Sequence, residues 1–178
     1  MANPRRKSST GGLGEFLVIL VITFALVFGV VRPFVVEAFY IPSESMVPTF
    51  EVGDRVFVNK FIYRFREPKQ GEIVVFKSIE GEQEDLIKRV VGVPGDTIML
   101  SNDTLLVNGV PKDEPYVNHR LPDLSSFGPV TVPEGKVFVL GDNRANSRDS
   151  RFFGPLPVQD VEGEAFVIFW PPGRLKLL

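Results

Sequence analysis

The sequence predicts a mainly β protein: an all-β domain attached to one N-terminal transmembrane helix. Two observations support this prediction. Apolar residues concentrate in one uncharged run, Phe16 to Val31, in which Thr23 is the only polar side chain. After about Phe39, β-branched and aromatic stretches alternate with turns rich in Gly, Pro, Asn and Asp, and no second helical pattern follows.

The first element is a polar tail, residues 1–12, which we expect to be disordered and cytoplasmic. The second is a membrane anchor over residues 13–36. Its uncharged run spans roughly 24 Å as a helix, and flanking apolar residues extend it toward the ~30 Å of a hydrocarbon core. One alternative is a cleavable signal peptide, but Val36-Glu37-Ala38 is a poor cleavage site. The other alternative is a buried helix of a soluble protein. The remaining chain is too short to build a core large enough to bury so apolar a helix.

The distribution of charge predicts the orientation of this anchor. Residues 1–15 carry a net charge of +2 and the rest of the chain a net charge of −4. By the positive-inside tendency, we expect a single-pass protein of the cytoplasmic (inner) membrane with its N-terminus in the cytoplasm. Residues 37–178 then form a domain on the outer face.

This domain is predicted to consist of short strands in a sandwich or barrel. A polar, proline-bearing segment, residues 111–129, is expected to be an extended loop or insertion over a sheet edge. Trp170 has two interpretations, which the pattern leaves open: a core residue, or part of an apolar rim at the bilayer surface. The predicted strands are RVFVNKFI (55–62), EIVVFK (72–77), DLIKRVVGV (85–93), DTIML (96–100), TLLVNGV (104–110), KVFVLG (136–141) and EAFVIFW (164–170).

Two serines one residue apart, Ser43 and Ser45 in IPSESM, raise the possibility of a serine hydrolase. Such an enzyme needs a base, and the only histidine, His119, lies in a polar stretch typical of solvated residues. There is no cysteine, and no side chains have metal-ligand spacing, so we expect no metal and no cofactor. The remaining candidate for the base is a lysine that is buried and therefore neutral. Lys88 lies in an aliphatic stretch, although this pattern alone is more typical of a solvated edge residue.

The stretch GDNRANSRDSRFFG, residues 141–154, packs Asp, Arg, Asn and Ser side chains into one segment. Surface ion pairs are the ordinary interpretation of such a loop. The alternative is a buried, paired network that fixes a loop beside a functional site.

Taken in order, three motifs closely resemble those of bacterial type I signal peptidases, which are membrane-anchored serine proteases. The motifs are IPSESMVPTF, IKRVVGVPGD and GDNRANSRDSRFFG. The resemblance covers nearly the whole chain after the tail. It implies the signal-peptidase-like β-fold and the removal of signal peptides from exported preproteins after an Ala-x-Ala-like site. Preprotein signal peptides and the lipid bilayer are then the expected partners, with no nucleic acid, and we expect a monomer.

The resemblance also assigns roles, residue by residue. It makes Ser45 the nucleophile and Lys88 the general base, with the Ser43 hydroxyl and the Ser45 backbone N–H as the oxyanion hole. It makes Ser147 the residue that orients the lysine, and Asp149 with Arg151 a supporting ion pair. Ile41 and Ile87 match residues that line the pockets for the small substrate side chains at positions −1 and −3.

One position departs from the family pattern, because Glu44 stands where many members have glycine. A glutamate would be strained if this position required a positive φ, so we expect an extended backbone with the side chain pointing away. Two other functional hypotheses remain. An inert paralogue would bind exported chains without cutting them. A self-cleaving Ser/Lys regulator would need a DNA-binding segment, of which residues 1–40 show no pattern.

Overall fold

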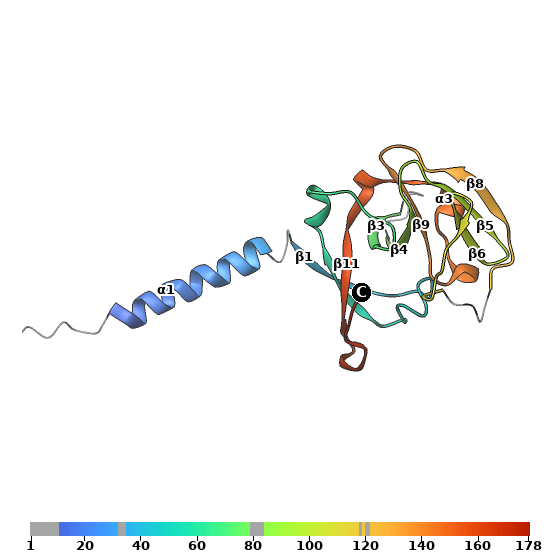
Figure 1. Cartoon of the computed structure of the whole chain (residues 1–178). Helices are drawn as coiled ribbons and strands as arrows, with labels where there is room; N and C mark the ends of the chain where they lie inside the picture. Colours follow the sequence, from blue (N-terminus) through green and yellow to red (C-terminus); the bar gives the residue numbers. More distant parts are fainter. Residues whose placement is uncertain (1–10, 32–34, 79–83, 118, 120–121) are drawn as a thin grey trace, which may run out of the picture.

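The apolar run near the N-terminus forms a helix that stands apart from the rest of the protein (Figure 1). The computed structural model describes residues 11–31, 35–78, 84–117, 119 and 122–178, so most of the predicted tail lies outside the described residues. Helix α1 (Gly11–Leu26) continues into a π-helical turn, η1 (Val27–Val31). Residues 12–29 are apolar and long enough to cross a membrane, with a mean hydropathy of 2.3 and no burial against the domain.

The rest of the described chain is mainly β-sheet, as predicted, and its strands are joined by short turns and single helical turns. The strands are β1 (Val36–Tyr40), β2 (Arg55–Asn59), β3 (Ile73–Lys77), β4 (Asp85–Gly92), β5 (Thr97–Ser101), β6 (Thr104–Val107), β7 (Val110–Pro111), β8 (Phe127–Thr131), β9 (Lys136–Leu140), β10 (Leu156–Pro157), β11 (Val161–Trp170) and β12 (Lys176–Leu177). The helical turns are η2 (Ile62–Arg64), η3 (Arg144–Asn146), α3 (Ser150–Phe153), η4 (Val158–Asp160) and η5 (Pro172–Arg174).

The strands form two antiparallel sheets. The larger sheet has the order β1-β2-β11-β3-β4-β9-β10, and β12 also pairs with β11. The smaller sheet has the order β7-β6-β5-β8 and lies on the side of the domain farthest from α1 (Figure 1). Strand β4 is therefore central, since it pairs with β3 on one side and with β9 on the other.

Strands β1 and β8 and the two-residue strands β10 and β12 lie outside the predicted set. Strand β1 begins at Val36, within the range expected for the anchor, and pairs along its length with β2. Strand β8 lies at the end of the segment expected to be a loop and pairs with β5. The described residues between β7 and β8, which are 112–117, 119 and 122–126, form turns and irregular chain with no strand or helix.

The alternating pattern of the strands buries one apolar face against the segment that carries the paired serines. Ile41, Met46 and Phe50 from this segment are almost completely buried. They join one core cluster with residues of β2, β3, β4 and β11, including Ile87. The IPSESM segment is therefore fixed to the sheet by its apolar side chains.

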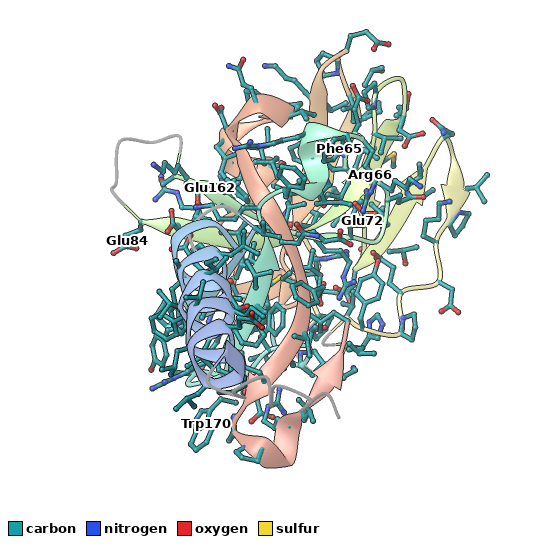
Figure 2. The ribbon with its side chains drawn as sticks, turned by 90° about the vertical axis from the view of Figure 1, so that its left-hand side faces the viewer. Phe65, Arg66, Glu72, Glu84, Glu162 and Trp170 are labelled. Carbon is teal, nitrogen blue, oxygen red and sulfur yellow. The ribbon has the colours of Figure 1, made fainter. Side chains whose placement is uncertain are left out.

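The core interpretation of Trp170 is wrong, because its side chain is 49% exposed. Figure 2 shows Trp170 at the end of β11, on the side of the domain that α1 joins. The adjacent residue, Phe169, packs against the sheet instead: its ring stacks on the Phe57 ring of β2, with the ring centroids 4.0 Å apart.

Candidate active site

Ser45 lies in the turn that follows β1. The buried side chains of Met46 and Phe50 hold this turn on the sheet, and Ser45 itself is 8% exposed. The Ser45 carbonyl accepts a hydrogen bond from the Asn143 N–H at 3.1 Å. The turn is thus fixed both by core packing and by the loop that follows β9.

Lys88 lies on β4, between β3 and β9, and only 2% of it is exposed. The expectation of a solvated edge residue, drawn from the pattern alone, is therefore wrong. The Lys88 amine lies 2.8 Å from the Ser45 hydroxyl oxygen and donates to the Ile87 carbonyl at 2.9 Å. A hydroxyl and an amine thus meet within hydrogen-bond distance in a nearly dry environment.

Burial lowers the pKa of the Lys88 amine from 10.5 to about 8, because the charged form loses its hydration. Asp149 and Asp142 oppose this effect and raise the pKa. A neutral fraction of about one-tenth is therefore present at pH 7, far more than for an ordinary lysine. A neutral amine has a free lone pair and can accept a proton from a hydroxyl.

Both of these carboxylates are buried, and each is paired with an arginine. Asp149 accepts hydrogen bonds from Arg151 Nε and Nη2, both at 2.8 Å. Asp142 accepts from Arg89 Nε at 2.9 Å and from Arg89 Nη2 at 2.7 Å. Because each negative charge has a cation against it, its effect on the Lys88 amine is reduced. The interpretation of residues 141–154 as surface ion pairs is wrong, and the buried network is present.

The segment before Ser45 borders a cavity of about 160 Å³. Ile41 and Ile87, which are 2% and 8% exposed, are among its lining residues. Ser43 also lines the cavity, and its hydroxyl oxygen lies 3.3 Å from that of Ser45. The remaining lining residues are Phe39, Tyr40, Pro42, Val75, Glu84, Asp85, Leu86 and Lys88. The cavity has apolar, polar and charged residues in its lining, and two of them, Ser43 and Lys88, lie within 3.3 Å and 2.8 Å of the Ser45 hydroxyl oxygen.

A family model described as "Signal peptidase, peptidase S26" matches residues 13–170. The chain belongs to this family. It is therefore a peptidase, a hydrolase of peptide bonds, and the resemblance seen in the sequence is confirmed.

Relatives with the same name match over most of their length. "Signal peptidase I" of Leptolyngbya laminosa is 46% identical over 152 residues, which cover 82% of this chain and 74% of the relative. "Signal peptidase IB" of Staphylococcus aureus (strain N315) is 38% identical over 178 residues, covering 91% of this chain and 92% of the relative. The signal peptidase I in a crystal structure from Enterococcus faecalis V583 is 35% identical in sequence. The structural match covers 56% of this chain and 97% of that chain, with a TM-score of 0.49.

Ser147 lies next to the Ser45 turn in this signal peptidase family member. A Cβ atom on Gly141 would lie 2.2 Å from the Ser147 hydroxyl oxygen and 2.5 Å from the Ser45 carbonyl oxygen. The Ser147 hydroxyl is buried and has no hydrogen-bond partner among the described residues, so no bond to Lys88 is formed. Its role in orienting the lysine stays a prediction.

Glu44 has an exposed side chain, and it is not among the described residues with a positive φ. The glutamate is therefore not strained in the way that a glycine-requiring position would impose. The backbone bends at this residue, and its carbonyl accepts from Asn143 Nδ2 at 3.1 Å. Its carboxylate lies 3.5 Å from Asn146 Nδ2.

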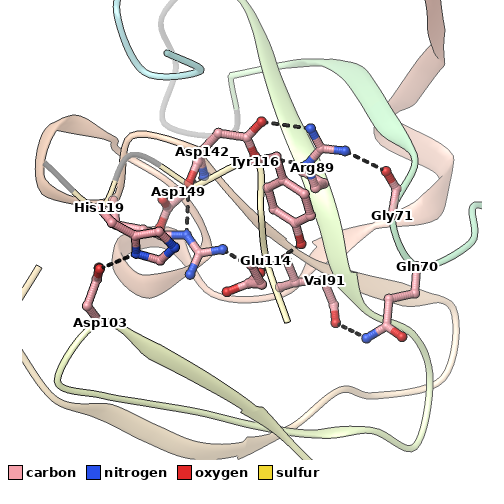
Figure 3. A network of polar contacts seen from close by, with 12 residues as sticks. Gln70, Gly71, Arg89, Val91, Asp103, Glu114, Tyr116, His119, Asp142 and Asp149 are labelled. Carbon is pink, nitrogen blue, oxygen red and sulfur yellow. Dashed lines mark hydrogen bonds and ion pairs between the residues drawn. The ribbon is translucent and has the colours of Figure 1, made fainter. Parts of the chain in front are cut away.

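No pattern within residues 111–129 predicted that this segment contributes to the site. Figure 3 shows that Tyr116 and Glu114 from this segment join the network around Arg89. The Arg89 guanidinium carbon lies 3.9 Å from the centre of the Tyr116 ring, and the Tyr116 hydroxyl donates to Glu114 at 2.8 Å. Glu114 also pairs with buried Arg144 at 2.7 Å. One signal was available, since a buried Arg in the 141–154 motif needs a carboxylate partner.

His119 takes no part in this arrangement. Its ring is largely exposed, and Nδ1 lies 3.0 Å from an Asp103 carboxylate oxygen (Figure 3). Among the described residues, no three His, Cys, Asp or Glu side chains are grouped so that they could hold a metal ion.

Proposed function

We propose that this protein is a membrane-bound serine endopeptidase that removes N-terminal signal peptides from exported preproteins. Ser45 is the nucleophile and Lys88 the general base. The observation that carries this proposal is the 2.8 Å separation of the Lys88 amine and the Ser45 hydroxyl, with the pKa of that amine lowered by burial. Proximity and a neutral base are the two requirements for activating a serine with a lysine.

In the proposed reaction, the Lys88 amine takes the Ser45 proton as the serine oxygen attacks the scissile carbonyl carbon. The Ser43 hydroxyl and the Ser45 N–H stabilise the oxyanion that forms. The same lysine then gives the proton to the departing amine, leaving an acyl-enzyme on Ser45. Water, activated by the neutral lysine, hydrolyses the acyl-enzyme and releases the signal peptide.

The cavity beside Ser45 supports a preference for small residues at positions −1 and −3. Ile41 and Ile87, which the resemblance assigns to these pockets, both line the cavity and are almost completely buried. Both also belong to the core cluster, so they resist moving aside for a bulky substrate side chain. An Ala-x-Ala-like site is the expected recognition sequence.

Helix α1, which is apolar and unburied, supports the proposed anchoring in the cytoplasmic membrane. The basic N-terminal residues favour a cytoplasmic N-terminus, and the peptidase domain then lies on the outer face. This arrangement brings the active site to the surface from which translocated signal peptides emerge.

The test uses the detergent-solubilised full-length protein and a preprotein with an Ala-x-Ala site, with product termini read by mass spectrometry. Wild type should cut after the −1 alanine. Ser45→Ala and Lys88→Ala should lose cleavage, and Lys88→His should not restore it, since the site is built for a long amine. Ser43→Ala should lower kcat by about 100-fold or more through loss of one oxyanion donor.

Wild-type protein that is folded by circular dichroism but leaves the preprotein intact would contradict the proposal. That outcome would favour a domain that binds exported chains without cutting them. Cleavage by Lys88→Ala at the wild-type rate would refute the role of the lysine.

A further inference from the structure

We propose that Glu44 makes this peptidase select against acidic residues, and in favour of basic ones, at the start of the released mature chain. This inference rests on the proposed function and deepens it. The inference concerns the substrate residues that follow the scissile bond and belong to the mature chain. The cavity, in contrast, is proposed to bind the signal-peptide residues that precede this bond.

The two sides of Ser45 are distinct in the structure. The cavity is lined by residues 39–43, Val75 and residues 84–88, and Glu44 is not among them. At Glu44 the chain turns instead toward the loop after β9, where Asn143 Nδ2 donates to its carbonyl. The carboxylate reaches farther along the same loop and lies 3.5 Å from Asn146 Nδ2.

The direction of the substrate follows from these positions. With the −1 side chain in the cavity and its carbonyl carbon at the Ser45 hydroxyl, the chain after the scissile bond must leave on the opposite side of Ser45. In our proposal this exit lies toward Glu44 and the loop containing Asn143 and Asn146, which contact one another and do not line the cavity. The first residues of the mature chain would then pass close to the Glu44 carboxylate.

The charge of Glu44 is available to the substrate. Its side chain is exposed, and among the described residues it has no ion-pair partner. Two exposed charges roughly 5 to 8 Å apart interact weakly in water, and salt screens them further. The Glu44 carboxylate attracts a lysine at the first mature position and repels an aspartate there. The two substrates should therefore differ about three- to tenfold in kcat/KM at low ionic strength.

The experiment compares preproteins that differ only at the first mature residue, which is Lys, Gln or Asp. Full-length wild type, Glu44→Gln and the control Glu134→Gln are assayed at low salt and again in about 1 M salt. Glu134 is an exposed carboxylate in the turn before β9, outside the residues of the site, so its variant removes the same charge elsewhere.

We expect wild type and Glu134→Gln to cut the three substrates in the order Lys, Gln, Asp, with the difference lost in high salt. Glu44→Gln should cut all three at similar rates. The inference would be overturned if wild type cut the three substrates at equal rates at low salt, or if Glu44→Gln kept the wild-type preference. Either result would leave the peptidase function intact. No cleavage of any substrate by wild type would instead count against the function on which the inference rests.

Discussion

The pH dependence of cleavage should report directly on the buried lysine. A pKa of about 8 in place of 10.5 means that charging Lys88 costs about 3 kcal/mol more in the folded protein than in water. Because its pKa is lowered, the amine becomes neutral on raising the pH through about 8. The neutral fraction rises from about one-tenth at pH 7 to about nine-tenths at pH 9, so kcat/KM should increase about tenfold over that interval.

The assay is cleavage of a preprotein by the detergent-solubilised full-length protein between pH 6 and 10, at substrate concentrations well below KM. The control is His119→Gln, which removes the only histidine, an exposed residue bonded to Asp103. We expect the same profile for both proteins. A flat profile between pH 7 and 9, or a pH dependence that disappears in His119→Gln, would refute the assignment of Lys88 as the base.

Two further predictions concern the residues that support the site. Gly141→Ala should reduce cleavage by at least about 100-fold, because its Cβ would lie 2.2 Å from the Ser147 hydroxyl and 2.5 Å from the Ser45 carbonyl; near-normal turnover would show that the loop can shift freely. Arg151→Gln should lower the free energy of unfolding by about 3 to 5 kcal/mol in urea titrations, because it leaves buried Asp149 without its cation; a loss below about 1 kcal/mol would mean that water reaches the carboxylate.

The strands that contain β-branched and aromatic runs were predictable from sequence because their alternation reflects one buried face. Strand β1 was not, because Val36–Tyr40 is only five residues long and directly follows the apolar anchor, and its assignment as a strand depends on pairing with Arg55–Asn59. Strand β8 was missed because its sequence, FGPVT, contains Gly and Pro, which ordinarily mark turns.

The burial of Lys88 shows a different limit. Period-two alternation places the side chain on a face but does not reveal which strands flank β4, and the central position of β4 is what excludes water. The motif resemblance proposed the lysine as base without explaining its environment. Likewise, the contacts of Glu114 and Tyr116 depend on how a polar connection folds over the sheet, which no local pattern in that segment specifies.

The strand that leads into the site also begins a few residues after the candidate membrane span. Fully extended, the chain between Val31 and Ser45 reaches at most about 50 Å. Within it, β1 is held straight by its pairing with β2. With the proposed anchoring, the length of this connection limits how far from the lipid surface Ser45 can act. We therefore expect preproteins whose cleavage site emerges beyond that height to escape processing, whatever their residues at −1 and −3.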